Sequence, residues 1–481
     1  MGEKGRGGKP RTSKRIDLII DKKSDFILPR TTTKKGGRNP MRETQIDLTL
    51  RFKMPESGLN VNGILMGLRQ ANARISSALL QALFSAVEEQ TIEQMQSEYP
   101  GRYVHNGYQT KERELRTSLG PFHYRLAQLY DKVEQKTVVP LRAIGFLPKD
   151  RRYTEEATEA GIGSVVHLSY RWSSKETARI REQAPSASAS TLHRRLREFA
   201  QQKCSWPDLK KVPYRFLMVD GTGVRLQGYK GANLGKGEMR WALASLGENE
   251  PFEPVGFWID KSWRKIKKDL ENRLDYKRLE ILFSDGEPAI EEALLEEGMP
   301  HQRCVLHGKR DFSYILYADG FKKAEQAPLR EKLEAIPVFH FNKERLEQLG
   351  PEDLPKVKDL AEKTQQGFQE MVDLLDPEKY PKARVYIKNL SRNIATFFSW
   401  WLEKKTWIPL NTNAIESAFS QVKNRIWSVG KRWSEKGLLN WLQVTMNKIF
   451  RPEMWKELWS QYMSLNPEFQ LTDIRVSWRW C

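Results

Sequence analysis

Three acidic residues are spaced so that they could build a phosphoryl-transfer site. Asp220 and Asp285 each follow a short apolar run and precede a glycine, and Glu416 lies in the first turn of an apolar-periodic helix. Hydrolysis or transfer of a phosphodiester needs two divalent cations about 3.5–4 Å apart. Mg²⁺ prefers carboxylate oxygens and water as ligands. The alternative is that each acid is an ordinary turn or helix residue, and for any single acid that is the simpler explanation.

Apolar periodicity shows which elements must position these acids. The stretch Tyr214–Gly223 is typical of a buried strand that ends at Asp220-Gly221 and delivers its carboxylate at the edge where open α/β sheets place their chemistry. Further strands are predicted at Trp241–Leu246, Pro254–Ile259, Leu279–Ser284 and Gln302–His307, and helices at Lys261–Leu274 and Glu287–Gly298. A ribonuclease H-like α/β fold has this order and gathers three carboxylates in one cluster.

The stretch Lys309–Lys404 is charged, free of strand alternation and repeatedly broken by proline. It predicts an all-helical insertion before the helix that carries Glu416. The glycine-rich stretch Gly228–Gly237 fits neither the Walker pattern nor the dinucleotide fingerprint, so a wide hairpin is the simpler interpretation.

Five stretches of the sequence resemble DDE transposases of the mutator-like superfamily, including the related bacterial insertion-sequence families. They are VDGTG at Val219–Gly223, SDGEPAI at Ser284–Ile290, CVLH at Cys304–His307, TNAIES at Thr412–Ser417 and GKRWSEKG at Gly430–Gly437. The resemblance implies that Asp220, Asp285 and Glu416 are catalytic and hold the metal ions. It also implies that Cys304 and His307 lie close to them as further catalytic-site residues.

Two other roles for Cys304 and His307 stay open. A structural zinc site needs four ligands, and only His301 lies near enough in sequence to help. A Cys-His nucleophilic pair needs the two side chains within hydrogen-bond reach and a third group to orient them. Support of the acid cluster, with His307 contacting a metal-bound phosphate or a carboxylate, is the interpretation we favour.

The charge of the chain predicts a polyanionic partner. Lys and Arg number 80 against 61 Asp and Glu, which gives a formal net charge of +19. No apolar run is long enough to span a bilayer and no signal peptide is visible, so we expect a cytoplasmic, nucleoid-associated protein of prokaryotic type. Residues 1–42 hold thirteen Lys/Arg and four acids, typical of a phosphate-binding arm or of a solubilising tail.

A helix-turn-helix is predicted at Ser174–Gln183, Ala184–Ser190 and Thr191–Gln202, with Ser190 as the N-cap of the second helix. The residues predicted to contact DNA are His193, Arg194, Arg195 and Arg197 of that helix, together with Lys431, Arg432 and Trp433.

The predicted domain order has seven segments. They are a basic flexible arm (1–43), an α+β DNA-binding region (44–150), a helix-turn-helix-like region (151–210), the first part of the ribonuclease H-like domain (211–321), the helical insertion (322–408), the second part of the ribonuclease H-like domain (409–462) and a C-terminal tail (463–481).

These observations predict a DNA transposase. Water activated between two Mg²⁺ ions, for which Mn²⁺ can substitute, would cut at the element's terminal inverted repeats, and the freed 3′-hydroxyl would attack target DNA. Because two double-stranded DNA ends must be joined, we expect a homodimer or higher oligomer, without a membrane. Two alternatives stay open: a DNA-binding regulator or inactive element relic, and a nuclease of the same fold that cuts without joining.

Overall fold

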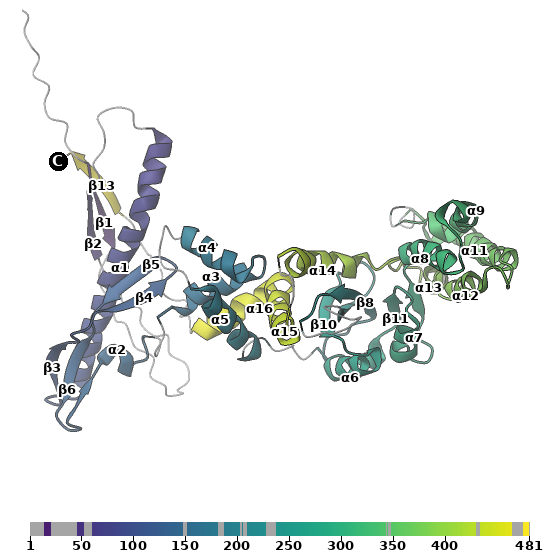
Figure 1. Ribbon diagram of the computed structural model, residues 1–481. Helices are drawn as coiled ribbons and strands as arrows, with labels where there is room; N and C mark the ends of the chain where they lie inside the picture. The colour runs from purple at the N-terminus through teal and green to yellow at the C-terminus, as the bar shows by residue number, and fades with distance from the viewer. Residues whose placement is uncertain are drawn as a thin grey trace, which may run out of the picture. The chain divides into compact units, whose positions relative to one another are not determined.

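A computed structural model describes residues 14–20, 46–51, 60–147, 152–180, 187–202, 204, 209–227, 237–342, 344, 348–429, 433–463 and 475–480. The chain forms two compact units, Met1–Arg195 with Trp455–Cys481 (unit 1) and Leu196–Met454 (unit 2). Within the described ranges no helix has the length and apolar character needed to cross a membrane. The α/β class predicted from the sequence is confirmed by a mixed sheet in unit 2 (Figure 1).

Unit 1 is built around one long helix, α1 (Val61–Glu98). Its strands are β3 (Tyr103–Tyr108), β4 (Arg113–Thr117), β5 (Gly120–Tyr124), β6 (Ala127–Asp131) and β7 (Lys136–Val138). Phe84 of α1 packs against Phe122 and Tyr124 of β5, with both pairs of ring centroids 5.1 Å apart. Its helices after β7 are α2 (Pro140–Ala143), α3 (Glu155–Val165), α4 (Tyr170–Ile180), α5 (Ala189–Gln202, which runs on into unit 2) and α16 (Pro452–Met463).

The predicted N-terminal arm contains a strand. β1 (Lys14–Ile20) pairs antiparallel with β2 (Ile46–Arg51) on one side and with β13 (Arg475–Trp480) on the other. The expectation of a flexible arm is therefore corrected for this stretch, because one of its two partner strands, β13, comes from a distant part of the chain. The rest of the predicted arm, residues 1–13 and 21–43, lies outside the described residues.

Unit 2 contains a five-stranded sheet in the order β10-β9-β8-β11-β12. The strands are β8 (Phe216–Val224), β9 (Gly237–Ser245), β10 (Glu253–Ile259), β11 (Ile281–Ser284) and β12 (His301–Arg303). β8 is parallel to β11, and β11 to β12, whereas β9 runs antiparallel to both of its neighbours. All of β11 and most of β8 and β9 are buried, as expected of central strands covered on both faces.

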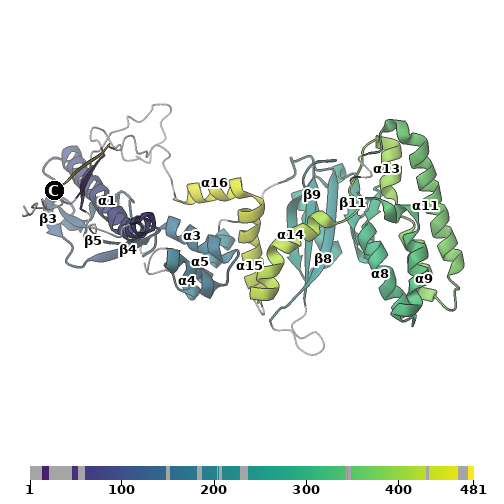
Figure 2. The same ribbon diagram turned by 90° about the horizontal axis from the view of Figure 1, so that it is seen from above.

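Helices cover both faces of this sheet. On one face, α6 (Trp263–Arg273) and α7 (Pro288–Leu294) pack Trp263, Ile266 and Ile290 into a core with Leu217 and Val219 of β8. On the other face lies α14 (Asn413–Asn424), which contacts β8 and β9 (Figures 1 and 2). α15 (Glu435–Thr445) follows it.

A helical region separates β12 from α14 in the chain. It comprises α8 (Val305–Ala318), α9 (Lys323–Glu334), α11 (Leu354–Leu374), α12 (Pro381–Leu390) and α13 (Thr396–Lys404), which gather beside the sheet (Figure 1). Phe312 of α8 and Tyr386 of α12 stack at 6.3 Å, and the Tyr386 hydroxyl donates to the Gly308 carbonyl at 2.9 Å. The start and the end of the region are joined, because the Val305 amide donates to the Leu410 carbonyl at 3.0 Å.

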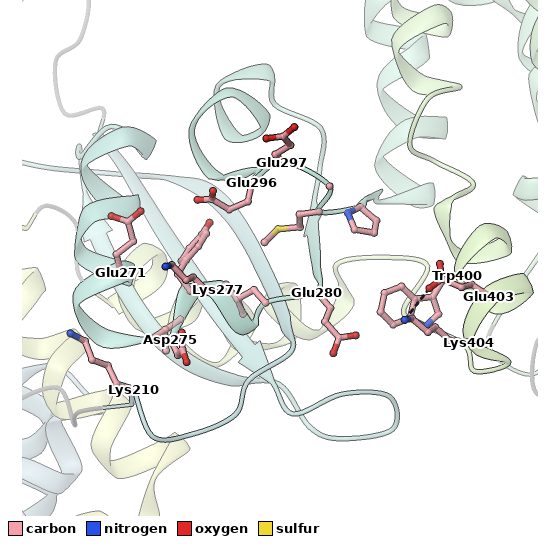
Figure 3. Close-up of a pocket in the computed structure, with 16 residues that line it drawn as sticks. Lys210, Glu271, Asp275, Lys277, Glu280, Glu296, Glu297, Trp400, Glu403 and Lys404 are labelled. Carbon is pink, nitrogen blue, oxygen red and sulfur yellow. Dashed lines mark ion pairs between the residues drawn. The ribbon is translucent and has the colours of Figure 1, made fainter.

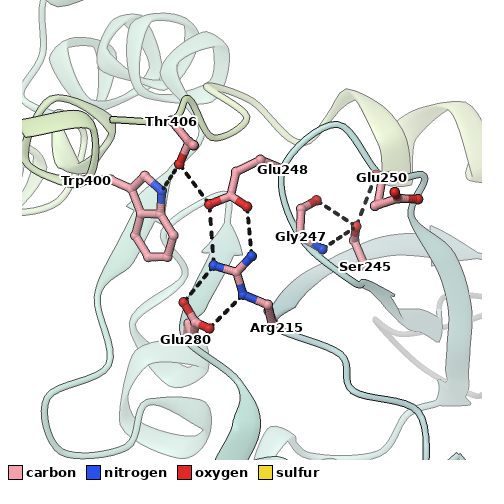
Figure 4. A network of polar contacts seen from close by, with 8 residues as sticks. All are labelled: Arg215, Ser245, Gly247, Glu248, Glu250, Glu280, Trp400 and Thr406. Carbon is pink, nitrogen blue, oxygen red and sulfur yellow. Dashed lines mark hydrogen bonds and ion pairs between the residues drawn. The ribbon is translucent and has the colours of Figure 1, made fainter. Parts of the chain in front are cut away.

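A polar network ties the starting ends of β8 and β11 together (Figure 4). Arg215, just before β8, donates to Glu280 at 2.7 and 3.0 Å and to Glu248 at 2.8 Å. Glu248 also accepts from the Thr406 hydroxyl at 2.9 Å, which joins the segment after α13 to the same guanidinium. Hydrogen bonds to Glu280 and Glu248 raise the pKa of Arg215, so this cation remains charged between its two acids.

We expect Arg215→Ala to destabilise unit 2 by about 1–3 kcal/mol, because Glu248 would keep a largely buried carboxylate without its cation. Chemical denaturation followed by circular dichroism measures this difference. The matched control is Arg264→Ala, since Arg264 and Glu292 form an exposed ion pair at 3.9 Å whose loss should cost less than about 0.5 kcal/mol. Equal losses in the two variants would contradict the structural role of Arg215.

Candidate active site

Asp220 lies on the face of the sheet that α14 covers. Side chains alternate along a strand, so Val219 points into the core under α6 and Asp220 points to the opposite face. Asp220 is paired with Trp241 on β9, and the Trp241 ring packs against Phe419 of α14 at a centroid distance of 5.0 Å. Only 6% of Asp220 is exposed.

The structure corrects where β8 ends. We expected the strand to stop at Asp220-Gly221, but its ladder with β9 continues to Val224 opposite Gly237. The parallel ladder with β11 stops earlier, at Met218 opposite Phe283. Asp220 therefore marks the point where β8 leaves β11, and β9 alone carries the strand onward.

Asp285 follows the last residue of β11 and lies beside Asp220. The parallel ladder pairs Ile281 with Phe216 and Phe283 with Met218, so Asp220 and Asp285 each lie two residues beyond its last pair, and the charge of Asp285 acts on Asp220. Adjacent strands are about 4.8 Å apart, so the two carboxylates come from neighbouring backbones at one sheet edge.

The turn after Asp285 requires glycine. Gly286 has a φ of +93°, and a Cβ there would lie 2.0 Å from Nε of Arg303. Arg303 is itself buried, and its Nε donates to the Asp285 carbonyl at 3.1 Å. The Glu287 amide donates to the Asp285 carboxylate at 3.0 Å, so the turn fixes the acid from both sides.

Cys304 and His307 begin a helix, which corrects the predicted strand over Gln302–His307. β12 ends at Arg303, the Cys304 amide donates to the Ser284 carbonyl at 2.8 Å, and the Cys304 carbonyl accepts the Gly308 amide at 2.9 Å. This N-terminal turn of α8 aims His307 at α14, where its Nε2 lies 2.9 Å from Oε1 of Glu416.

The three acids act on one another electrostatically. Burial is the largest of the causes that raise the pKa of Asp220 to about 8, and the charges of Asp285 and Glu416 add to it. The Gly221 amide, 2.7 Å from the Asp220 carboxylate, and the charge of Arg310 work in the opposite direction. Asp220 therefore sits in an environment that disfavours a further negative charge.

Each carboxylate of the cluster is nevertheless held by a separate group. Asp220 accepts from Gly221, Asp285 from Glu287, and Glu416 is engaged by His307. In the ranges that the structure describes, no set of three His, Cys, Asp or Glu side chains is arranged to hold one metal ion.

Several supporting residues were missed by sequence reasoning. The Ser284 hydroxyl lies 2.8 Å from Nε2 of His301 and accepts the Gly286 amide at 3.1 Å. Nδ1 of His301 in turn lies 2.7 Å from Nδ2 of Asn393, which comes from the far end of the helical region. No local sequence pattern links Asn393 to Ser284, whereas Arg310 could have been found from its helical spacing of three residues after His307.

The arrangement favours a supporting role for Cys304. Its side chain is 1% exposed, and no hydrogen bond joins it to His307 within the described part of the chain, so it lacks the geometry of a nucleophilic pair. His301, the one nearby candidate for a zinc ligand, is already hydrogen-bonded to Ser284 and Asn393.

The predicted DNA-contacting residues have different surroundings. On α5, His193, Arg194 and Arg197 are exposed and Arg195 is partly buried. Lys431 and Arg432 lie outside the described residues. Trp433 is buried, with the Arg425 guanidinium 4.6 Å above its ring and Trp441 at 5.5 Å, so its indole is a packing group and not an open stacking surface.

Two helices stand where the helix-turn-helix was predicted, with shifted ends. α4 starts at Tyr170, before the predicted Ser174, and is described to Ile180; residues 181–186, which hold the end of the predicted first helix and the start of the predicted turn, lie outside the described ranges. The N-cap of α5 is Ser188 in place of Ser190, since the Ser188 hydroxyl accepts the Thr191 amide at 3.2 Å.

A separate groove of about 950 Å³ lies at the starting ends of β11 and β12, away from the acid cluster (Figure 3). Its walls include Leu279 and Glu280 before β11 and Pro300 before β12. The charged residues around it are Glu271, Asp275, Glu280, Glu296, Glu297 and Glu403 against Lys210, Lys277 and Lys404. This excess of carboxylates makes the groove a poor site for a phosphate backbone.

Comparisons with known proteins leave the family of the chain open. No protein-family model and no curated protein sequence matches it. Among solved structures, it is similar to the Drosophila P element transposase strand transfer complex, with 13% identity over 66% of this chain and 98% of that chain, at a TM-score of 0.34. A score of this size does not establish a shared fold.

In the metal-free protein, kept so by a chelator, we expect stability to fall as pH rises from about 4 to about 8. Over this pH window native Asp220 keeps a proton that the unfolded chain has lost. A rise in pH therefore stabilises the unfolded state relative to the native state, and the free energy of unfolding falls. Asp220→Asn should remove this dependence and be the more stable protein at pH 8. Thermal denaturation of both proteins across the window measures the difference; parallel pH profiles would contradict the burial of an acid here.

Gly286→Ala should destabilise the protein by about 1–3 kcal/mol, because the new methyl group meets both a left-handed backbone and the buried Arg303. Gly298→Ala is the matched control, since Gly298 has a φ of +79° but open space around it. Denaturation midpoints should drop further for Gly286→Ala than for the control. A larger loss at Gly298 would show that Arg303 yields easily.

Proposed function

We propose that the chain is a metal-dependent DNA transposase whose unit 2 holds a ribonuclease H-like catalytic domain. The observation that carries this proposal is the convergence of Asp220, Asp285 and Glu416 at one edge of the sheet, coupled through the raised pKa of Asp220 and the bond from His307 to Glu416. A sheet in which the second strand alone is antiparallel is also the arrangement that ribonuclease H-like domains use, and it supports the proposal. The mutator-like sequence stretches around the same acids add to it.

The chemistry of the three acids fits Mg²⁺. All three offer carboxylate oxygens, and burial together with mutual repulsion leaves Asp220 in surroundings that a nearby cation would relieve. Bound at these carboxylates, Mg²⁺ would supply charge stabilisation and a water of lowered pKa. Asp220 and Asp285 would hold it from adjacent strands, and Glu416 from α14, after these side chains turn away from the separate groups that now hold them.

The protein's own groups would prepare and orient this site. His307 holds the Glu416 carboxylate at 2.9 Å and so fixes the third acid, which is otherwise about half exposed. The turn at Gly286 fixes Asp285, and loss of the Asp220 proton prepares that carboxylate for a cation. Water would attack the phosphodiester first and the freed 3′-hydroxyl of the DNA end would attack the target strand next.

DNA is the polyanion that the charge of +19 and the exposed basic residues of α5 fit. Terminal inverted repeats would supply the specific contacts, and target DNA the second substrate. Joining two ends in one reaction calls for two copies of the chain at least.

A strand-transfer assay separates this function from its rivals. Labelled duplexes carrying the sequences that flank the gene are incubated with protein, Mg²⁺ and a supercoiled target plasmid. Joined products support the transposase, and cleavage without joining indicates a nuclease. Binding alone would indicate a regulator, an alternative favoured by the separate engagement of each carboxylate.

Asp285→Asn should lower cleavage by a factor on the order of 10³ or more while leaving DNA affinity equal or higher, because one ligand oxygen charge is lost and the repulsion of phosphate is reduced. Gel-based cleavage and fluorescence anisotropy measure the two quantities. The control is Asp275→Asn, which should cleave normally, because Asp275 is a partly exposed acid that pairs with Arg278 at the starting ends of the strands. Full cleavage by the Asp285 variant would overturn the assignment of the three acids.

A further inference from the structure

One face of α8 is open along its whole length and begins at the acid cluster. Leu306, Arg310, Tyr314 and Tyr317 are exposed and recur at helical spacings of three and four residues. The opposite face of the same helix is packed, with Phe312 and Leu316 fully buried. The open residues therefore form a single stripe, which we call the α8 stripe.

The tyrosines of this stripe are unusually exposed for their size. Tyr314 is 68% and Tyr317 71% exposed, and neither side chain makes a hydrogen bond or ring contact with another described residue. Packing inside the chain thus explains neither ring. Aromatic side chains that stand free on a basic protein are suited to stacking on nucleobases, since every base has a π-face.

Arg310 connects the stripe to the acid cluster. It lies one turn after His307, which is bonded to Glu416, and its charge reaches both Glu416 and Asp220. Its Nε donates to the neighbouring Asp311 at 3.0 Å, and its side chain is otherwise largely exposed. A guanidinium beside a phosphoryl-transfer site is suited to a DNA phosphate, because it matches phosphate geometry with two parallel donors.

We propose that the α8 stripe binds unpaired nucleotides of the DNA end next to the cleaved bond, with Arg310 on a backbone phosphate and Tyr314 and Tyr317 stacked on successive bases. This inference rests on the proposed function, because it takes the acid cluster as the place of the chemistry. We assign single-stranded DNA as its occupant for three reasons. The stripe begins at the acid cluster, Arg310 supplies a cation close to that cluster, and the rings of Tyr314 and Tyr317 follow further along the helix.

The test measures binding without catalysis. The full chain, in chelator, is titrated into a fluorescein-labelled oligothymidylate of about 15 nucleotides and into a duplex of the same length. Tyr314→Ala and Tyr317→Ala should each weaken single-strand binding about tenfold and leave duplex binding nearly unchanged. Tyr314→Phe and Tyr317→Phe are the matched controls and should bind as the wild type does, because they keep the ring.

Arg310→Ala should weaken binding and reduce the magnitude of the slope of log affinity against log salt by about 1, as expected for the loss of one phosphate contact. Arg310→Lys should keep most of that slope. Photo-crosslinking with 5-bromouracil in the oligonucleotide should map to the peptide that contains Tyr314 and Tyr317. Because these side chains are exposed, the variants should melt at the wild-type temperature, which shows that any loss of binding is local.

Three results would overturn the proposal. They are wild-type single-strand affinity in both alanine variants, an equal loss in the phenylalanine controls, or a change of oligomeric state in place of DNA affinity. The last would identify the stripe as a protein interface. None of these readouts needs cleavage, so a chain that binds through the stripe yet never cuts would refute the proposed function and leave the stripe assigned.

Discussion

The parallel ladder between β8 and β11 is the constraint on which unit 2 depends. It brings Asp220 and Asp285 to the same end of the sheet, each two residues past the last pair of the ladder. Two carboxylates on adjacent strands repel each other, and burial under α14 deepens the cost for Asp220, whose pKa rises accordingly. The surrounding fold must therefore hold together two groups that would separate if they were free.

Acidic groups are balanced by a cation at the starting ends of these two strands but not at their finishing ends. At the starting end, one guanidinium stands between Glu248 and Glu280 and balances them. At the finishing end, the acids outnumber the cations, and Arg310 opposes the shift of Asp220 only in part. The charges are balanced at the starting ends of these strands and unbalanced at their finishing ends. A functional site can keep such an unfavourable arrangement only where the neighbouring structure holds it in place.

Local patterns in the sequence identified much of this arrangement. Apolar runs located β8, β9, β10 and β11, and the turn residues after them pointed to Asp220 and Asp285. What they could not supply depended on partners far along the chain. β8 runs past Asp220 because β9 continues to pair with it, and Cys304 caps a helix because its amide is taken by Ser284. Strand β1 exists through its pairing with β13 near the other end of the chain.

The distance along the chain between His307 and Glu416 affects when the cluster can form. The two residues are 109 positions apart, with α9, α11, α12 and α13 between them. At the usual pace of synthesis the ribosome needs about 5–20 s to make that stretch. Asp220 and Asp285 can pair on their strands well before the third acid exists, so a nascent or truncated chain carries an incomplete cluster. Synthesis of α14 thus sets the time at which the three acids can come together.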